Sequence, residues 1–220
     1  MIFMAKIGLP KAWVLKVVAR KRIQIADRFI LLLQDDNPTN TCLEIGGPNF
    51  TATDILTTRF RSYIILNTNR KELTNPSLNC NFVPIQGDGC LLPFADASID
   101  FIFCNAVIEH VPKAKRPMLA QEIQRVCSKG FFISTPYYWF PFEPHYHLPF
   151  IQYLPETIRQ FVLRFSTIGF VKRHSSQYIR LLTSQELKSL FPQATGGGIR
   201  TALIPEIIYV SYLKKSGEEN

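Results

Sequence analysis

Two segments of this 220-residue chain carry residues whose types and spacing suit the binding of a small charged ligand. In the first, an apolar run stops at Glu44 and is followed by Gly46, Gly47 and Pro48. Glycine lets the backbone bend sharply and leaves N–H groups open beside a ligand, so this turn could hold a nucleotide-like molecule. In the second segment, Asp88 follows another apolar run and can accept hydrogen bonds from such a ligand.

Three histidines could supply acid–base chemistry, because imidazole titrates near neutral pH. His110 follows the predicted fourth strand, and His145 and His147 lie in a segment rich in aromatic residues. For His110, a purely structural hydrogen bond is an equally good interpretation. Glu143 together with His145 and His147 offers three metal-ligand types, but this spacing lacks a fourth partner and we expect no metal.

Apolar runs alternate with helical patterns along the chain, which predicts an α/β fold with a doubly wound, mostly parallel sheet and helices on both faces. The predicted strands are residues 42–45, 63–66, 82–85, 99–104, 131–134, 199–203 and 207–212, and the predicted helices include 53–60, 154–165 and 183–191. The carboxyl ends of parallel strands share one edge, where open α/β sheets bind ligands. Residues 137–150 are predicted to form a shaped loop without regular structure, and Gly196 to Gly198 to separate two elements.

Residues 41–136 resemble a class I S-adenosylmethionine-dependent methyltransferase, of the large group in which Glu-His follows the fourth strand. The specific part of the resemblance is the run Gly87-Asp88, Leu92-Pro93-Phe94, Ile99-Asp-Phe-Ile102 and Glu109-His110. The C-terminal third agrees only in layout. The resemblance implies a Rossmann-like sheet of seven strands that ends in an antiparallel pair, with S-adenosylmethionine as the cofactor.

The resemblance also implies a role for each cofactor-binding position. Glu44 would act toward the amino-acid end of the cofactor, and the chain at Gly46, Gly47 and Pro48 would approach it closely. Asp88 would accept from the adenine amine, and the backbone of Gly89 or Cys90 would serve a ring nitrogen. Asn105 would accept the cofactor's ammonium through its backbone carbonyl. Asn67 and Thr68 end the second strand, where the ribose would bind.

Two departures from the family pattern affect these expectations. Pro48 and Phe50 stand where the family has further glycines, and proline offers no N–H group. Asn67 stands where the family has an acid for the ribose hydroxyls, and an amide has neither the charge nor the second acceptor. We therefore expect weaker cofactor binding or a helper nearby, and Asn69 or Glu72 could take this role in another register.

Methyl transfer requires the acceptor and the methyl group to be aligned and, for a hydroxyl acceptor, the removal of a proton. Aromatic residues gather in 137–150, which has few acids and favours an acceptor of apolar or ring character. We predict O-methylation of a small, lipid-linked or sugar-linked acceptor, with N- or C-methylation left open. The alternatives are a methyltransferase-fold domain that binds without catalysis and a dinucleotide-dependent enzyme, which the absence of the ribose acid disfavours.

Composition limits the other classes of function. No apolar run reaches the length of about 18 residues that crosses a bilayer, and most of the net charge of +8 lies in residues 1–34. We interpret this basic segment as amphipathic helix that caps the core, in preference to a peripheral contact with a membrane, and we expect no nucleic-acid binding. Five scattered cysteines favour a reduced, cytoplasmic protein, at most peripheral to the inner face of a membrane.

The expected organisation is a helical segment at 1–34 and one methyltransferase domain at 35–213. A substrate loop and helical insertion at about 136–180 would interrupt this domain, and 214–220 would form a flexible tail. The sequence leaves the acceptor and the oligomeric state open.

Overall fold

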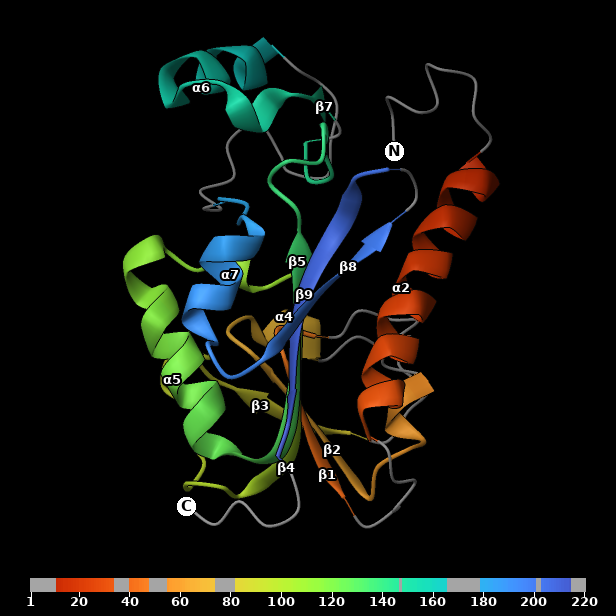
Figure 1. The fold of residues 1–220 in the computed structure, drawn as a ribbon, viewed down its shortest axis with the longest axis vertical. Helices are drawn as coiled ribbons and strands as arrows, with labels where there is room; N and C mark the ends of the chain where they lie inside the picture. Colours follow the sequence, from red (N-terminus) through yellow and green to blue (C-terminus); the bar gives the residue numbers. More distant parts are fainter. Residues whose placement is uncertain are drawn as a thin grey trace.

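The computed structural model of the chain describes residues 11–33, 40–47, 55–73, 82–146, 148–165, 179–200 and 203–214. Within them, seven strands form one sheet in the order β3-β2-β1-β4-β5-β9-β8 (Figure 1). The strands are β1 (Thr41–Ile45), β2 (Ser62–Asn67), β3 (Val83–Gln86), β4 (Ile99–Asn105), β5 (Cys127–Pro136), β8 (Thr195–Arg200) and β9 (Pro205–Leu213). The first five are parallel, and β9 runs antiparallel to both β5 and β8. The predicted doubly wound sheet with a closing antiparallel pair is confirmed.

Helices cover both faces of the sheet, which explains why its central strands are continuous apolar runs. Helix α2 (Lys11–Leu33) lies on one face, and α5 (Arg116–Val126) and α7 (Ser184–Leu190) lie on the other (Figure 1). On the α2 face, Phe29 is fully buried and its ring centroid lies 5.1 Å from that of Phe103. On the opposite face, Leu43 and Ile102 pack with Leu119 of α5. In this arrangement α2 caps the core, as the sequence predicts for part of the basic segment.

The chain turns sharply between β4 and α5, at the carboxyl edge of the sheet. Two 3-10 turns, Ile108–His110 and Lys113–Lys115, replace a regular helix there. Pro112 has no N–H group to continue a helix, and a proline at the start of α5 suits its first turn. The first of these turns follows β4 and packs against β5, where the hydroxyl of Thr135 donates to Glu109.

The segment after β5 is more regular than the sequence predicts. Two short strands, β6 (Phe142–Glu143) and β7 (Leu148–Pro149), form an antiparallel hairpin, so the prediction of a loop without regular elements is wrong at this point. Proline is tolerated in such an edge strand because one side of the strand needs no N–H partner. A 3-10 turn, Ile151–Tyr153, and helix α6 (Glu156–Phe165) follow. Figure 1 shows α6 beyond the end of β5, away from the helices that cover the sheet.

The glycine run near the C-terminus lies inside a strand and does not separate elements, which corrects the prediction. Gly196 to Gly198 are part of β8 and pair with β9. A Cβ atom at Gly197 would lie 2.3 Å from Cζ of Tyr209, whose ring stacks on Phe132 at a centroid distance of 4.9 Å. The glycine is required by this close approach between neighbouring strands.

The cysteines in the described part of the chain, Cys42, Cys90, Cys104 and Cys127, are free thiols, and Cys80 lies outside it. Burial raises the pKa of Cys127 to about 12, which keeps its thiol protonated and unreactive.

Among the helices of the described residues, none is both long enough and apolar enough to span a bilayer.

Candidate functional site

A cavity of about 620 Å³ opens where β1, β2 and β3 end, and its volume is in the range of small-molecule sites. Six of the residues predicted to bind the cofactor line it: Gly46, Asn67, Thr68, Asp88, Gly89 and Cys90. They come from three separate strand ends, which the sheet brings to one edge. Their convergence follows from the parallel register of β1, β2 and β3.

The glycine turn after β1 has the geometry that only glycine tolerates well. Gly46 has φ of +82°, and a Cβ atom there would lie 2.2 Å from Cγ2 of Val107. The Gly46 N–H donates to the carbonyl of Leu66 at 2.7 Å, which fixes the turn against the end of β2. The backbone therefore comes close to the cavity without a side chain in the way.

Asn67 is buried and its amide faces the glycine turn. Its Nδ2 donates to the carbonyls of Gly46 and Gly47, at 3.2 and 2.8 Å, and to Oε2 of Glu72 at 2.9 Å. Its Oδ1 accepts from the backbone N–H of Asn69 at 2.8 Å. Asn67 thus ties β2 to the turn, and it brings the carboxylate of Glu72, from the short helix α4 (Arg70–Leu73), to the cavity wall.

The side chain of Asp88 stabilises the loop that follows β3. Oδ1 of Asp88 accepts from the backbone N–H of Cys90 at 2.9 Å, and the side chain remains exposed at the cavity wall. The next residue, Gly89, has little room for a side chain, because a Cβ atom there would lie 2.9 Å from Cδ1 of Leu119. Asp88 therefore combines the turn role with a position where it can accept from a ligand.

Several predicted residues lie away from the cavity surface. Glu44 is buried on the α2 side of the sheet, where the hydroxyl of Tyr63 donates to its Oε2 at 2.8 Å. Gly47 packs against the Glu44 carboxyl group. Asn105 is buried, and its Oδ1 accepts from Ser134 at 2.8 Å. Pro48 and His147 lie outside the described residues.

Two cations line the cavity that the sequence analysis did not single out: Arg22 of α2 and Lys115. Burial lowers the pKa of Arg22 from its ordinary value. In the sequence Arg22 is one of many cations in the basic segment, and only the packing of α2 on the sheet distinguishes it. The cavity wall thus carries positive charge from α2 and negative charge from Glu72 and Asp88.

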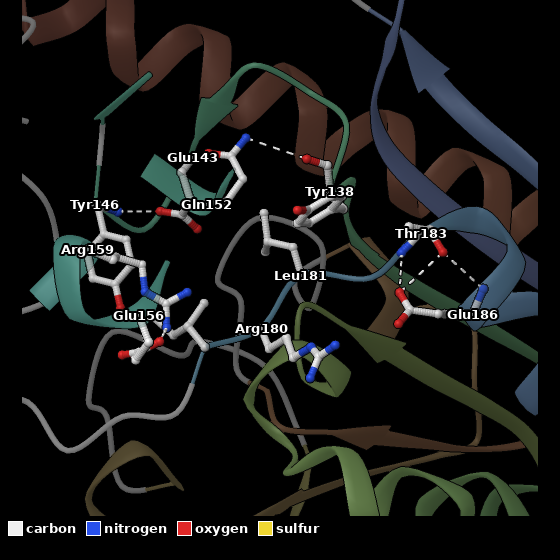
Figure 2. Close-up of a pocket in the computed structure, with 11 residues that line it drawn as sticks. Tyr138, Glu143, Tyr146, Gln152, Glu156, Arg159, Arg180, Leu181, Thr183 and Glu186 are labelled. Atoms are coloured by element: carbon white, nitrogen blue, oxygen red, sulfur yellow. Dashed lines mark hydrogen bonds and ion pairs between the residues drawn. The ribbon is translucent and has the colours of Figure 1, made fainter. Parts of the chain in front are cut away.

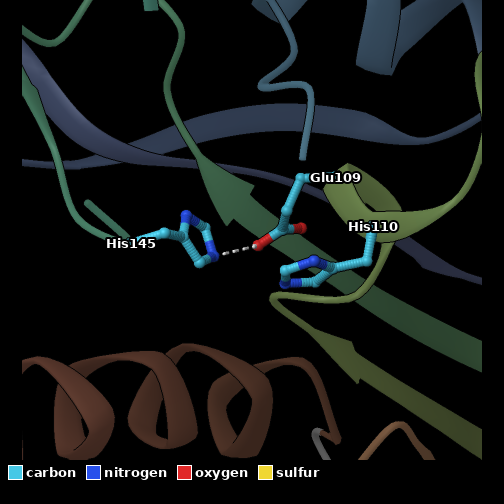
Figure 3. A group of neighbouring side chains, drawn as sticks. All are labelled: Glu109, His110 and His145. Carbon is cyan, nitrogen blue, oxygen red and sulfur yellow. Dashed lines mark ion pairs between the residues drawn. The ribbon is translucent and has the colours of Figure 1, made fainter. Parts of the chain in front are cut away.

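His110 and His145 both line this cavity, and the carboxylate of Glu109 lies between their rings (Figure 3). Their rings meet edge to face with centroids 5.0 Å apart. The Nε2 atom of His145 lies 3.9 Å from Oε1 of Glu109, and its Nδ1 lies 2.7 Å from Oε1 of Glu143. We refer to Glu109, His110 and His145 as the histidine cluster.

The acids around the histidine cluster are deeply buried. Glu109 is 0% exposed, and burial raises the pKa of its carboxyl group above the ordinary value. Its Oε2 accepts from the hydroxyl of Thr135 at 2.9 Å. Burial acts to lower the pKa of His145, but the hydrogen bond and charge of Glu143 outweigh it, so that pKa lies above its ordinary value.

A second cavity, of about 480 Å³, is lined by Glu143 and ten other residues (Figure 2). Tyr138, Tyr146 and Leu181 give it ring and apolar surface. Its polar lining comes from Glu143, Gln152, Glu156, Arg159, Arg180, Thr183 and Glu186. Glu143 lines this cavity while it holds His145, which lines the first one, so one hydrogen-bonded pair connects the two.

The strands and turns that line the first cavity lie in a part of the chain that matches a known protein family. Residues 43–134 match the family model of the methyltransferase domain. A sequence search of the curated proteins finds no match.

Solved structures show the same fold at low sequence identity. The magnesium protoporphyrin IX methyltransferase of Synechocystis, with S-adenosylhomocysteine bound, superposes with a TM-score of 0.61 at 9% identity, over 90% of this chain and 84% of that one. The PH0226 protein of Pyrococcus horikoshii also gives 0.61, at 15% identity over 89% and 91% of the two chains. This chain spans only 47% of a candidate sarcosine dimethylglycine methyltransferase from Galdieria sulphuraria, whose TM-score of 0.47, at 21% identity over 54% of this chain, is too low to bear on the fold.

Proposed function

Since residues 43–134 form a class I S-adenosylmethionine-dependent methyltransferase domain, we propose that the chain methylates an oxygen of a small, lipid-linked or sugar-linked acceptor. The observation that carries this proposal is that two residues of the histidine cluster, His110 and His145, line the cofactor cavity. Polar groups that can help a hydroxyl lose its proton lie there beside the space that the cofactor would occupy.

The residues of the larger cavity fit the cofactor, which supplies an electrophilic methyl group on a sulfonium when it is bound. The glycine turn at Gly46 gives the open backbone that an amino acid or nucleoside needs for close approach. Arg22 can face the carboxylate of the amino-acid end, and Asp88 can accept from the adenine amine. The cavity volume of about 620 Å³ suffices for a ligand of this size.

We assign the ribose hydroxyls to Glu72 and not to position 67. The amide of Asn67 already donates to Gly46, Gly47 and Glu72, so it holds the turn and the acid in place. Glu72 lines the cavity with a carboxylate that can accept two hydroxyls. The acid that is missing at the end of β2 is thereby replaced by one five residues later.

The smaller cavity supports an acceptor with a ring or apolar portion. Tyr138 and Tyr146 provide flat apolar surface, and Arg159 and Arg180 provide donors for hydroxyl or anionic groups. Its shared residue, Glu143, also orients His145 through Nδ1. An acceptor held on this side would have its reacting oxygen directed toward the histidine cluster.

The test uses radioactive methyl-labelled S-adenosylmethionine with separate lipid and water-soluble extracts of cells as acceptor mixtures. We expect label to enter one fraction and to be released as methyl iodide by hydriodic acid, which cleaves O-methyl groups. The His145→Ala variant should transfer at least about 100-fold less label, in the range typical of lost acid–base or activating groups. Label that resists hydriodic acid would contradict O-methylation and would indicate an N- or C-methyl product.

A further inference from the structure

The histidine cluster places three metal-ligand atoms from two distant parts of the chain in one small volume. One ligand atom each from Glu109, His110 and His145 lies within 4.8 Å of the others. Ligands about 2.1 Å from one ion lie roughly 3 to 3.5 Å apart, so a movement of about 1 Å would complete the set. Between His145 and Glu109 the distance is already 3.9 Å.

The carboxylate of Glu109 gives an independent sign of a ligand. The side chain is 0% exposed, and its Oε1 has no hydrogen-bond partner among the described residues. A buried carboxylate oxygen without a partner costs free energy, because it has lost its contact with water. Figure 3 shows this oxygen directed at His145, into the space that the two imidazoles border.

Outer hydrogen bonds hold the ligands as they do in many protein metal sites. Glu143 accepts at Nδ1 of His145, which leaves Nε2 as the atom that faces the cluster. Thr135 donates to Oε2 of Glu109, which leaves Oε1 as the ligand atom of that residue. The backbone N–H of Tyr146 in turn fixes Glu143 at 2.6 Å.

The charge of the cluster also favours a divalent cation. Glu109 and Glu143, both nearly unexposed, approach His145 from two sides. Two buried carboxylates are balanced in charge by one divalent ion, with both imidazoles neutral. Imidazole nitrogen and carboxylate oxygen together suit zinc, manganese, iron or cobalt better than magnesium or calcium, which prefer oxygen alone.

We propose that Glu109, His110 and His145 bind a divalent transition metal ion beside the cofactor cavity. From the sequence we expected no metal, because only Glu143, His145 and His147 were considered together as ligands. Both histidines line the cofactor cavity, so open coordination positions of the ion would face that cavity.

For catalysis, the inference rests on the proposed function. An acceptor hydroxyl bound to the ion would have a lower pKa and would release its proton to water. The deprotonated acceptor oxygen would then bond to the methyl carbon as the methyl–sulfur bond breaks, and the electron pair of that bond would stay on sulfur.

Metal binding is measured on the whole chain after dialysis against a chelator. Cobalt(II) serves as the probe, followed by its visible absorption, with zinc as the competitor and mass spectrometry for stoichiometry. We expect one ion per chain, with affinity lowered at least about 100-fold in His110→Ala and in His145→Ala. The matched control is His174→Ala, which removes a histidine outside the described residues, and it should bind cobalt(II) as the wild type does.

Glu109→Gln tests the third ligand, and circular dichroism with thermal unfolding verifies that each variant is folded. The inference is overturned if the wild type binds no ion, or if folded His110→Ala and His145→Ala variants both bind cobalt as tightly as the wild type. In that case the contacts of His145 with Glu109 and Glu143 are ion pairs that do not involve a metal. Methyl transfer is scored separately: label transferred by metal-free protein would refute the catalytic role of the ion and leave the proposed function intact, and the titration alone decides whether the ion binds.

Discussion

At the scale of single residues, the hydrogen bonds of Asn67 at the end of β2 are the reason for proposing Glu72 as the ribose-binding acid. An Asp at position 67 would place a carboxylate against the carbonyls of Gly46 and Gly47, where the amide now donates. It would also face Glu72, at 2.9 Å from the present Nδ2. The asparagine is therefore suited to this turn, and the acid at 72 depends on it.

Restoring the family's acid should weaken cofactor binding and not improve it. Asn67→Asp removes three donated hydrogen bonds and adds a repelling charge, so we expect affinity for S-adenosylmethionine to fall about 10-fold or more. Glu72→Gln should lower it about 10- to 100-fold, the cost of charged hydrogen bonds to the ribose. Calorimetric titration measures both, and Asp96→Asn, which alters an exposed carboxylate paired with Arg125, is the control. Tighter binding by Asn67→Asp would show that the assignment of the ribose to Glu72 is wrong.

At the scale of the elements, side-chain hydrogen bonds fix the register at the entry of the two central strands. The backbone N–H and hydroxyl of Thr41 both donate to Oδ2 of Asp100, at 2.8 and 3.0 Å, and Lys129 lies 3.1 Å from Oδ1. Burial acts to raise the pKa of Asp100, but the donors from Thr41 and Lys129 outweigh it and hold that pKa below its ordinary value. The ionised carboxylate therefore stabilises the folded state.

The hydrogen bonds of Asp100 predict that the stability difference between the wild type and an Asp100→Asn variant depends on pH. Because the folded pKa of Asp100 is depressed, its contribution is present above the unfolded value of about 3.9 and is lost as pH falls through the folded value. Asp100→Asn should lower the free energy of unfolding by about 1 to 3 kcal/mol at pH 7, and the difference should shrink below about pH 4. Urea unfolding at pH 7, 5 and 3 measures it, beside Asp96→Asn, for which we expect a change within about 1 kcal/mol. A difference that stays constant down to pH 3 would contradict the assigned role.

Local sequence signals predicted some elements well and others poorly. The helix predicted at 183–191 is confirmed as α7, and the sequence Thr183-Ser-Gln-Glu186 starts it with a capping box: the hydroxyl of Thr183 accepts from the N–H of Glu186, whose carboxylate accepts from the N–H of Thr183. The β6–β7 hairpin and the glycine strand β8 were wrongly predicted. The hairpin pairs Phe142 with Pro149 in a segment whose prolines argue against strands, and β8 is a strand because it pairs with β9. Gly197 pairs beneath Tyr209, and no local pattern shows that contact.

At the scale of the whole molecule, the sheet order explains why the site could be predicted only in part. Gly46, Asn67 and Asp88 lie at the carboxyl ends of the parallel strands β1, β2 and β3. Their convergence therefore follows from the fold class. Arg22 and His145 reach the same cavity from outside the strand–helix alternation, through α2 and the segment after β5. Their positions depend on how these elements pack, which composition and periodicity do not determine.

Calorimetric titration of the whole chain with S-adenosylmethionine and S-adenosylhomocysteine, beside NAD, tests the central claim that this cavity holds the methyl donor. We expect micromolar binding of both ligands at one per chain and no binding of NAD. A folded sample that binds neither ligand would contradict it, because the cavity at the ends of β1 to β3 would then not be a cofactor site.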